Sequence, residues 1–302
     1  MKLSRIFFQI SLLVCMGVNA AMSFAQNMGT KVFDAHGIQH LLMSKTNGVN
    51  LSLGSDDPNT APNYSFDFKA KALALQEGGI KFWRLPASQL QYSSGGVGVS
   101  ARLHLVTSHE KQTYTWKTQR GYLASPADIH NQEFTVYVRV HDLVSPNIAQ
   151  ISMKIRGGGH HSSDPDAASC VMMTFAPSSK KIVARFGKEL THPIYDYVNL
   201  VSNIAGGLIE GQWIGLKFLS WKDPLHANQV INQLFIDADG FNDLSKPTNQ
   251  WKKVSEYVDI EGKSTGNYTK MVDWSGPQTT LRVDGYRLVD FVYPSLREIA
   301  PP

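Results

Sequence analysis

Four polar or charged residues alternate with apolar residues between positions 150 and 156. The polar set is Gln150, Ser152, Lys154 and Arg156, with Ile151, Met153 and Ile155 between them. Side chains two positions apart on a strand point to the same face, so the stretch predicts one polar row. Arginine binds a carboxylate through paired hydrogen bonds and lysine binds it as a point charge. The row therefore predicts a surface for an anionic group.

Two further stretches have the same character. Their residues are Tyr137, Arg139 and His141 in one and Trp213, Lys217 and Trp221 in the other. If the three strands are neighbours, cations, amides and aromatic rings share one surface, a combination that suits an acidic polysaccharide. The alternative is the ordinary solvated face of an antiparallel sheet, which carries polar residues at the same period.

Metal-independent β-elimination is the reaction that these residue types could perform. It requires a group that neutralises the uronate carboxylate, which we expect of Arg156, Arg139 and Gln150. Proton transfer suits histidine and tyrosine, and we expect it of His192 and Tyr195. These five are the predicted catalytic residues. Predicted substrate contacts are Tyr137, His141, Lys154, His160, His161, Lys188, Trp213, Lys217 and Trp221.

Two histidines follow three glycines at positions 157–159. His160 and His161 are predicted to touch substrate, although a glycine-rich segment of this kind also fits a flexible exposed loop. With Asp164 they form a His-His-x-x-Asp pattern, which lacks a further fixed ligand for a metal.

An acidic stretch later in the chain suggests a calcium site. Asp237 and Asp239 precede Gly240, and alternating oxygens with a turn glycine suit that cation. Thr248 stands at the twelfth position, where a calcium loop carries an acidic residue, so a hairpin turn explains the stretch equally well. We therefore predict no cofactor, with calcium as a minor alternative. Cys170 lies among apolar residues and is predicted to pack as a small hydrophobe.

The N-terminus has the pattern of a bacterial signal peptide. Lys2 and Arg5 precede a mostly apolar stretch over residues 6–18, and Ser23-Phe24-Ala25 predicts cleavage after Ala25. Loss of Lys2 and Arg5 would lower the formal charge from +4 to +2, which argues against a nucleic-acid partner. We expect an exported monomer, periplasmic or extracellular, with no transmembrane segment and with a glycan as its partner.

Short strands dominate the rest of the chain. Alternating or apolar runs bounded by Gly, Pro, Asn or Asp cover residues 79–85, 99–106, 133–140, 150–156, 169–175, 181–186, 212–221, 230–236, 279–283 and 290–299. Only residues 64–76 have some helical character. The pattern predicts an all-β antiparallel sandwich of the jelly-roll type, with a concave groove and few or short helices. We expect one domain over residues 61–302, preceded by an N-terminal arm over residues 26–60.

Three segments resemble the concanavalin A-like jelly-roll group, which includes alginate-lyase-like polysaccharide lyases and sugar-binding modules. They are the ending Asp290-Phe291 with Leu296-Arg297-Glu298-Ile299, the stretch 213–218, and the stretch 185–197 with GKELTHPIY. The resemblance implies a sandwich that binds and cleaves an acidic polysaccharide. Where such lyases carry the pattern Gln-Ile-His, this sequence has Gln150-Ile151-Ser152. Where they carry Arg-x-Glu, Arg139 has no glutamate two residues later. Carbohydrate binding without cleavage, or a surface interaction protein, therefore remains the alternative.

Overall fold

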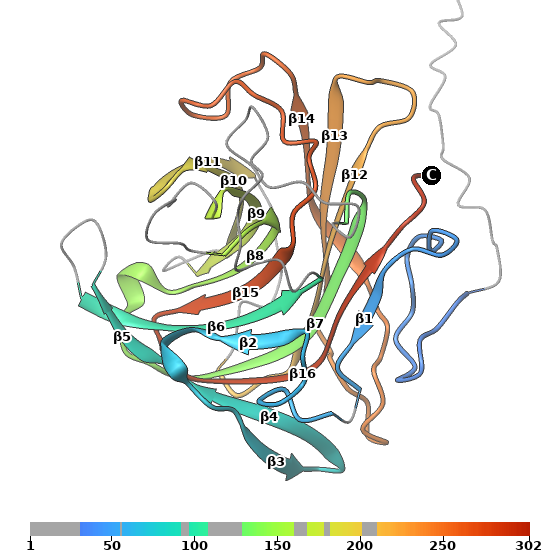
Figure 1. Cartoon of the computed structure of the whole chain (residues 1–302). Helices are drawn as coiled ribbons and strands as arrows, with labels where there is room; N and C mark the ends of the chain where they lie inside the picture. Colours follow the sequence, from blue (N-terminus) through green and yellow to red (C-terminus); the bar gives the residue numbers. More distant parts are fainter. Residues whose placement is uncertain are drawn as a thin grey trace, which may run out of the picture. The chain divides into compact units, whose positions relative to one another are not determined.

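The computed structural model describes residues 31–54, 56–91, 97–107, 129–159, 168–177, 182–200 and 210–302 (Figure 1). The chain divides into two units, Met1–Lys31 and Val32–Pro302, and all the elements below belong to the second. Predicted contacts His160 and His161 lie outside the described residues. In the part of the chain that is described, no helix has the length and apolar character needed to cross a membrane.

Eight strands form the sheet that we call sheet 1. Its order is β14 (Lys252–Ile260), β13 (Gln229–Asp237), β12 (Ile214–Lys222), β7 (Gln132–Leu143), β16 (Tyr286–Glu298), β4 (Ile80–Pro86) and β3 (Leu73–Glu77). The eighth strand, β1 (Asn50–Ser52), pairs with β16. The predicted N-terminal arm thus contributes a strand to the sandwich.

The other eight strands form sheet 2. Its order is β11 (Ile194–Leu200), β10 (Ile182–Thr191), β9 (Cys170–Pro177), β8 (Gln150–Gly157), β15 (Gln278–Asp284), β6 (Val97–Val106) and β2 (Tyr64–Phe66), and β5 (Ser88–Gln91) pairs with β6. In Figure 1 this sheet lies on the left, and sheet 1 runs along its right and lower sides. The pairings within both sheets are antiparallel.

Alternate residues of the strands fill the space between the sheets. Val136 and Val138 of β7 and Ile151 and Met153 of β8 belong to one buried apolar cluster. Removal of this surface from water is the main favourable contribution to folding. Two one-turn 3-10 helices, η1 (Asp67–Lys69) and η3 (Pro146–Ile148), lie in connections between strands. The predicted all-β antiparallel sandwich is confirmed, and residues 64–76 form β2, η1 and β3 rather than a longer helix.

A β-bulge changes the predicted polar row on β8. Lys154 pairs with Thr280 and Gly157 with Gln278, so β8 has one extra residue between these two pairs. Arg156 has a φ of 57° there, and its side chain is fully buried. Its Nε donates to Ser220 Oγ of β12 at 3.1 Å and its Nη1 to the Trp274 carbonyl at 2.8 Å. The prediction that Arg156 shares a face with Lys154 is therefore wrong.

Candidate functional site

The three predicted polar rows lie on two different sheets. β7 lies between β12 and β16, whereas β8 lies between β15 and β9. The rows on β7 and β12 are neighbours, since Tyr137 pairs with Gly215. Gln150 and Lys154 belong to the other sheet. The prediction of one surface shared by all three rows is therefore wrong.

The outer face of sheet 1 is closed by the chain itself. Tyr137 is fully buried against the rings of Phe241 and Trp251, with centroids at 4.9 and 5.7 Å. Lys217 is also fully buried, and its Nζ donates to Glu133 at 3.0 Å and to Thr135 at 2.8 Å. Neither side chain can reach a polymer, so both predicted substrate contacts are wrong.

The remaining residues of this face are also engaged in internal contacts. Arg139 Nη2 lies 2.7 Å from Glu77 and 2.9 Å from Asp290, and the guanidinium sits over the rings of Phe82 and Trp213. His141 Nε2 lies 2.8 Å from the same Asp290. Asp290 and Glu77 hold Arg139 against Phe82 and Trp213 on sheet 1, and Arg139 does not line the pocket described below, so the structure does not support its role with a uronate.

Two predicted tryptophans are packing residues of sheet 1. Trp221 is buried with Leu219 and Ile299. Trp213 packs edge-on against Phe82 with ring centroids 5.5 Å apart. Both side chains are therefore engaged in packing within the protein rather than in the predicted stacking on sugar rings.

The acidic stretch at 237–239 serves the turn. Asp237 is fully buried, and its two carboxylate oxygens accept the hydroxyls of Tyr137 and Thr248. Gly240 has a φ of 55°. The described residues contain no group of three or more His, Cys, Asp or Glu side chains able to hold a metal ion. The hairpin alternative thus accounts for this stretch.

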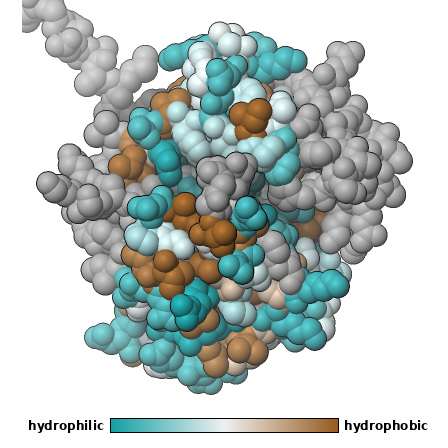
Figure 2. Space-filling view, turned by 90° about the vertical axis from the view of Figure 1, so that its left-hand side faces the viewer, coloured by the Kyte–Doolittle hydropathy of each residue, from teal (hydrophilic) through white to brown (hydrophobic). Residues whose placement is uncertain are grey.

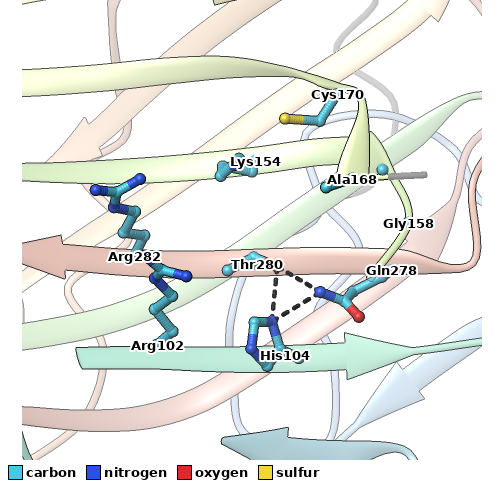
Figure 3. A pocket seen from close by; sticks show the side chains of 10 residues that line it. Arg102, His104, Lys154, Gly158, Ala168, Cys170, Gln278, Thr280 and Arg282 are labelled. Atoms are coloured by element: carbon cyan, nitrogen blue, oxygen red, sulfur yellow. Dashed lines mark hydrogen bonds between the residues drawn. The ribbon is translucent and has the colours of Figure 1, made fainter. Parts of the chain in front are cut away.

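Sheet 2 has one face that packs against sheet 1 and one that points away from it, and we call the second its open face. This open face carries a polar pocket (Figure 3). It is lined by Arg102 and His104 of β6, Gln278, Thr280 and Arg282 of β15, Lys154 and Gly157 of β8, Cys170 of β9, and Gly158 and Ala168. Figure 2 views the side of the molecule on which sheet 2 lies, and hydrophobic residues stand there between hydrophilic ones. Six polar or charged side chains from three adjacent strands thus meet around one hollow.

Tyr195 reaches across sheet 2 to the edge of this pocket. Its phenol oxygen lies 3.4 Å from Lys154 Nζ and 3.3 Å from Arg282 Nη1. Burial raises the pKa of Tyr195 above its usual value, and the positive charges of Lys154 and Arg282 oppose that rise. The phenol is therefore protonated at neutral pH, with two cations placed to stabilise its charged form.

Glu189 holds two of the predicted residues in place. Its carboxylate lies 2.8 Å from Lys154 Nζ and 2.6 Å from His192 Nδ1. Burial by itself would raise the pKa of Glu189, but Lys154 and His192 outweigh that effect and lower the pKa to about 2. Burial raises the pKa of the adjacent Cys170 thiol to about 12, which leaves it a neutral packing group, as predicted.

A second polar group lines the other side of the pocket. Asp67 lies 2.8 Å from His104 Nε2 and 2.7 Å from Arg102 Nη1. The Gln278 amide nitrogen lies 2.9 Å from His104 Nδ1, and Thr280 Oγ1 lies 2.8 Å from the same ring nitrogen. His104 is therefore oriented by a carboxylate on one side and an amide on the other.

Sequence reasoning missed Arg102, His104 and Arg282. The strands that carry them were predicted at 99–106 and 279–283, and Arg102 and His104 have the same two-residue spacing as Ser152 and Lys154. That spacing was the signal from which a second polar row could have been predicted. Whether the two rows meet in one pocket depends on strand order, because β15 lies between β6 and β8.

Two other predicted residues of sheet 2 have different outcomes. Gln150 is on the open face, where its amide donates to Asp284 at 2.8 Å. Lys188 points to the opposite side, is fully buried, and donates to Asp259 at 2.6 Å. The predicted substrate contact of Lys188 is therefore wrong, because its position on β10 faces sheet 1.

Comparisons with known proteins identify polysaccharide lyases and lectins among similar structures. No family model and no curated protein sequence matches the chain. An endo-β-1,4-glucuronan lyase from the fungus Trichoderma reesei has 12% identity over 80% of this chain and 92% of that one, with a TM-score of 0.42. The alginate lyase Aly36B has 14% identity over 84% and 98%, with a TM-score of 0.36. The Lotus tetragonolobus seed lectin has 9% identity over 84% and 100%, with a TM-score of 0.39.

The sequence resemblance named polysaccharide lyases and sugar-binding modules. The assignment of this chain as an antiparallel β-sandwich rests on its own two sheets. No activity is carried over from these proteins, so the function is argued below from the site alone.

Proposed function

We propose that the chain binds an acidic polysaccharide on the open face of sheet 2 and cleaves it by β-elimination. One observation carries the proposal: the Tyr195 phenol oxygen lies within 3.4 Å of both Lys154 Nζ and Arg282 Nη1 at the edge of a polar pocket. A proton-transfer group beside two cations is the minimum that eliminative cleavage of a uronate requires.

The two cations bind the uronate carboxylate. Arg282 donates to Tyr195 through Nη1 and to Asp284 through Nε, and its guanidinium has five N–H donors in all. Lys154 adds a second positive charge at the same phenol. As the proton on the carbon next to the carboxylate leaves, negative charge spreads onto the carboxylate oxygens. Fixed cations stabilise that charge more than they stabilise the ground state.

Tyr195 transfers the proton. Its phenolate takes the proton from the carbon next to the carboxylate, and the freed electron pair forms the carbon–carbon double bond. The bond to the leaving sugar oxygen breaks, and the phenol returns the proton to that oxygen. Because burial raises the pKa of Tyr195, the phenolate is a minor form at neutral pH, and we expect the rate to increase as the pH rises.

Glu189 and His192 are positioning residues in this scheme. Glu189 fixes Lys154 at 2.8 Å, and His192 supports Glu189 at 2.6 Å. The role of His192 therefore differs from the direct proton transfer expected from the sequence. Asp67 in the same way holds Arg102 and His104 on the far side of the pocket.

Binding without cleavage is the second candidate function. It is favoured by the pairing of three cations on this face with carboxylates of the protein: Arg102 with Asp67, Lys154 with Glu189, and Arg282 with Asp284. Such pairs reduce the net charge available to a substrate. A lectin-like protein would keep these contacts and transfer no proton.

Product analysis separates the two candidates. The purified protein is incubated with alginate, polyglucuronate and pectate, while absorbance of the unsaturated product is followed in the ultraviolet. Elimination predicts rising absorbance and a fragment one water lighter than a hydrolysis product of the same length. Bound but intact polymer would leave only the binding function, and absence of both binding and product on a broad acidic panel would overturn the whole proposal.

Export and a monomeric state complete the proposal. The charged start and apolar stretch of residues 1–25 support removal of a signal peptide. Sequencing of the secreted or periplasmic protein should begin at Gln26, and light scattering should give the mass of one chain. A first residue at Met1 in the exported fraction, or a dimeric mass, would contradict these two points.

A further inference from the structure

Arg185 lies on the open face of sheet 2, beside the pocket rather than in its lining. Its Nη2 donates to Gln150 Oε1 at 3.2 Å, and its Cζ lies 4.8 Å from the centroid of the Tyr197 ring. Among the residues that the structure describes, Arg185 has no carboxylate partner. The other cations of this face, Arg102, Lys154 and Arg282, each have one. Arg185 is therefore held by neutral groups and keeps its full charge for a ligand.

A glycine allows the ring that supports Arg185 to approach the sheet. Gly187 pairs with Tyr197 across β10 and β11, and a Cβ on Gly187 would lie 2.7 Å from Cδ1 and Cε1 of that ring. Contacts this short do not occur, so any larger residue would displace Tyr197. A glycine in a strand interior often marks such a close approach.

Two parallel tyrosines separate Arg185 from the proposed reaction centre. The rings of Tyr195 and Tyr197 have centroids 6.2 Å apart and an interplanar angle of 9°. Lys154 Nζ lies 5.2 Å from the Tyr195 centroid, as Arg185 lies near that of Tyr197. The face thus presents a cation, two rings and a second cation in sequence.

The register sets the two cations apart along and across the strands. Arg185 pairs with Thr174, which pairs with Ser152, while Lys154 lies one two-residue step further along β8. The two Cα positions therefore differ by about 7 Å along the strands and by about 10 Å across them. Both side chains are also anchored, Lys154 to Glu189 and Arg185 to Gln150.

We propose that Arg185 binds the carboxylate of a second uronate in the same polymer chain. This inference rests on the proposed function and narrows its substrate class. A polymer that is acidic at neighbouring sugars satisfies both Arg185 and the Lys154–Arg282 pair. A polymer with only one uronate among the sugars bound on this face leaves Arg185, which lies over Tyr197, without an anionic partner. Such a polymer binds more weakly.

The test compares binding of two ligands in the Tyr195→Phe background, which keeps the ring and removes the phenol oxygen. The ligands are a hexamer of whichever polyuronate the wild-type protein binds and the same hexamer with about half its carboxylates reduced to alcohols. Calorimetry gives both dissociation constants. Arg185→Gln is expected to weaken binding of the acidic hexamer on the order of tenfold or more, since a charge-assisted contact is lost. The preference for the acidic over the reduced hexamer should fall by a similar factor.

Two further variants complete the design. Arg185→Lys keeps a point charge and should recover part of the preference, because lysine lacks the paired donors. Arg287→Gln changes an exposed arginine of β16 on sheet 1 and should leave both constants unchanged. Thermal unfolding of each variant checks that it is folded.

The outcomes separate the two proposals. If Arg185→Gln weakens both hexamers equally, its role is structural and the inference is overturned. The inference is also overturned if Arg185→Gln leaves the dissociation constant of the acidic hexamer unchanged. If the parent protein binds neither alginate, polyglucuronate nor pectate, the proposed function itself fails.

Discussion

The two outer faces of this sandwich carry the same kinds of residue, but these residues differ in how deeply they are buried. On sheet 1, Lys217 and Tyr137 are fully buried beneath rings and loops. On sheet 2, Tyr195, Tyr197 and Arg185 remain half-buried. Rows of cations and aromatics at strand spacing occur on both. The chain covers the row on sheet 1 with its own 237–251 segment, whereas the row on sheet 2 borders the polar pocket.

Cations of sheet 1 that the chain covers stabilise the fold, whereas cations of sheet 2 that line the pocket or lie beside it can bind a ligand. Lys217 and Arg297 share the carboxylate of Glu133, at 3.0 and 2.7 Å, so all three charged groups are bound within the protein. Arg185 has only neutral partners among the described residues. Position relative to the pocket, rather than residue type, therefore distinguishes the two faces, and the following predictions test that distinction in order of expected effect.

The largest effect on stability is expected on sheet 1. Lys217→Ala removes one of the two cations that contact the buried Glu133, and Arg297 remains as its partner. We therefore expect a loss at the lower end of the about 3–5 kcal/mol that breaking a buried pair costs. Urea unfolding should show this loss, while the folded variant should keep its affinity for the polymer. Unchanged stability combined with lost affinity would contradict the assignment of Lys217 to the fold.

Arg282→Gln tests the corresponding cation on sheet 2. Loss of a donor that stabilises developing negative charge typically lowers the rate by a factor of about 10²–10³. Initial rates of product absorbance would show this. The matched variant Arg84→Gln, on sheet 1 beside Asp290, should retain the wild-type rate. Equal rate losses in both variants would remove the distinction between the faces.

Acid should destabilise sheet 2 through Glu189. Its folded pKa of about 2 lies below the ordinary value of 4.5, so its stabilisation is present above pH 4.5 and is lost as the pH falls toward 2. The difference corresponds to about 3 kcal/mol. Melting temperatures measured from pH 7 to pH 3 should fall less steeply for Glu189→Gln than for wild type.

The control for that titration is Glu77→Gln on sheet 1. The Glu77 carboxylate is 65% exposed, so an exposed ion pair is all that this change removes. The acid transition should follow that of wild type. A Glu189→Gln curve parallel to the wild-type curve would show that Glu189 does not contribute to acid sensitivity.

The smallest effect on polymer affinity is expected for Trp213→Ala. The ring packs against Phe82 and Phe241 within sheet 1, so its loss should reduce stability and leave polymer affinity within the error of the measurement. Calorimetric titration with the polymer checks this. A clear loss of affinity in a folded variant would restore the sequence-based prediction that Trp213 stacks on sugar.

Local patterns in the sequence predicted the strands well, because their alternation is a property of a few adjacent residues. The stretches 133–140 and 150–156 lie within β7 and β8. Strand order is different, since β8 pairs with β15 more than 120 residues away. Nothing in either strand's pattern encodes that pairing, and so Arg282 and His104 were missed while Arg139 was included.

The orientation of single side chains was also beyond the pattern. Arg156 would share the face of Lys154 in a regular strand, but a bulge turns it inward. Lys188 was selected for its charge, yet its place on β10 faces Asp259 of sheet 1. Gln150, Lys154 and Tyr195 lie on strands of sheet 2, and His192 lies in the turn between β10 and β11, where it contacts Glu189.

The most direct measurement compares two tyrosine-to-phenylalanine changes, one on each face. Tyr195→Phe should lower the rate of unsaturated product formation by about 10²–10⁴, the usual contribution of a proton-transfer group, while polymer binding persists. Tyr293→Phe, half-buried beside His36 on sheet 1, should react at the wild-type rate. Full activity in Tyr195→Phe, or an equal loss in Tyr293→Phe, would contradict the assignment of the reaction to the open face of sheet 2.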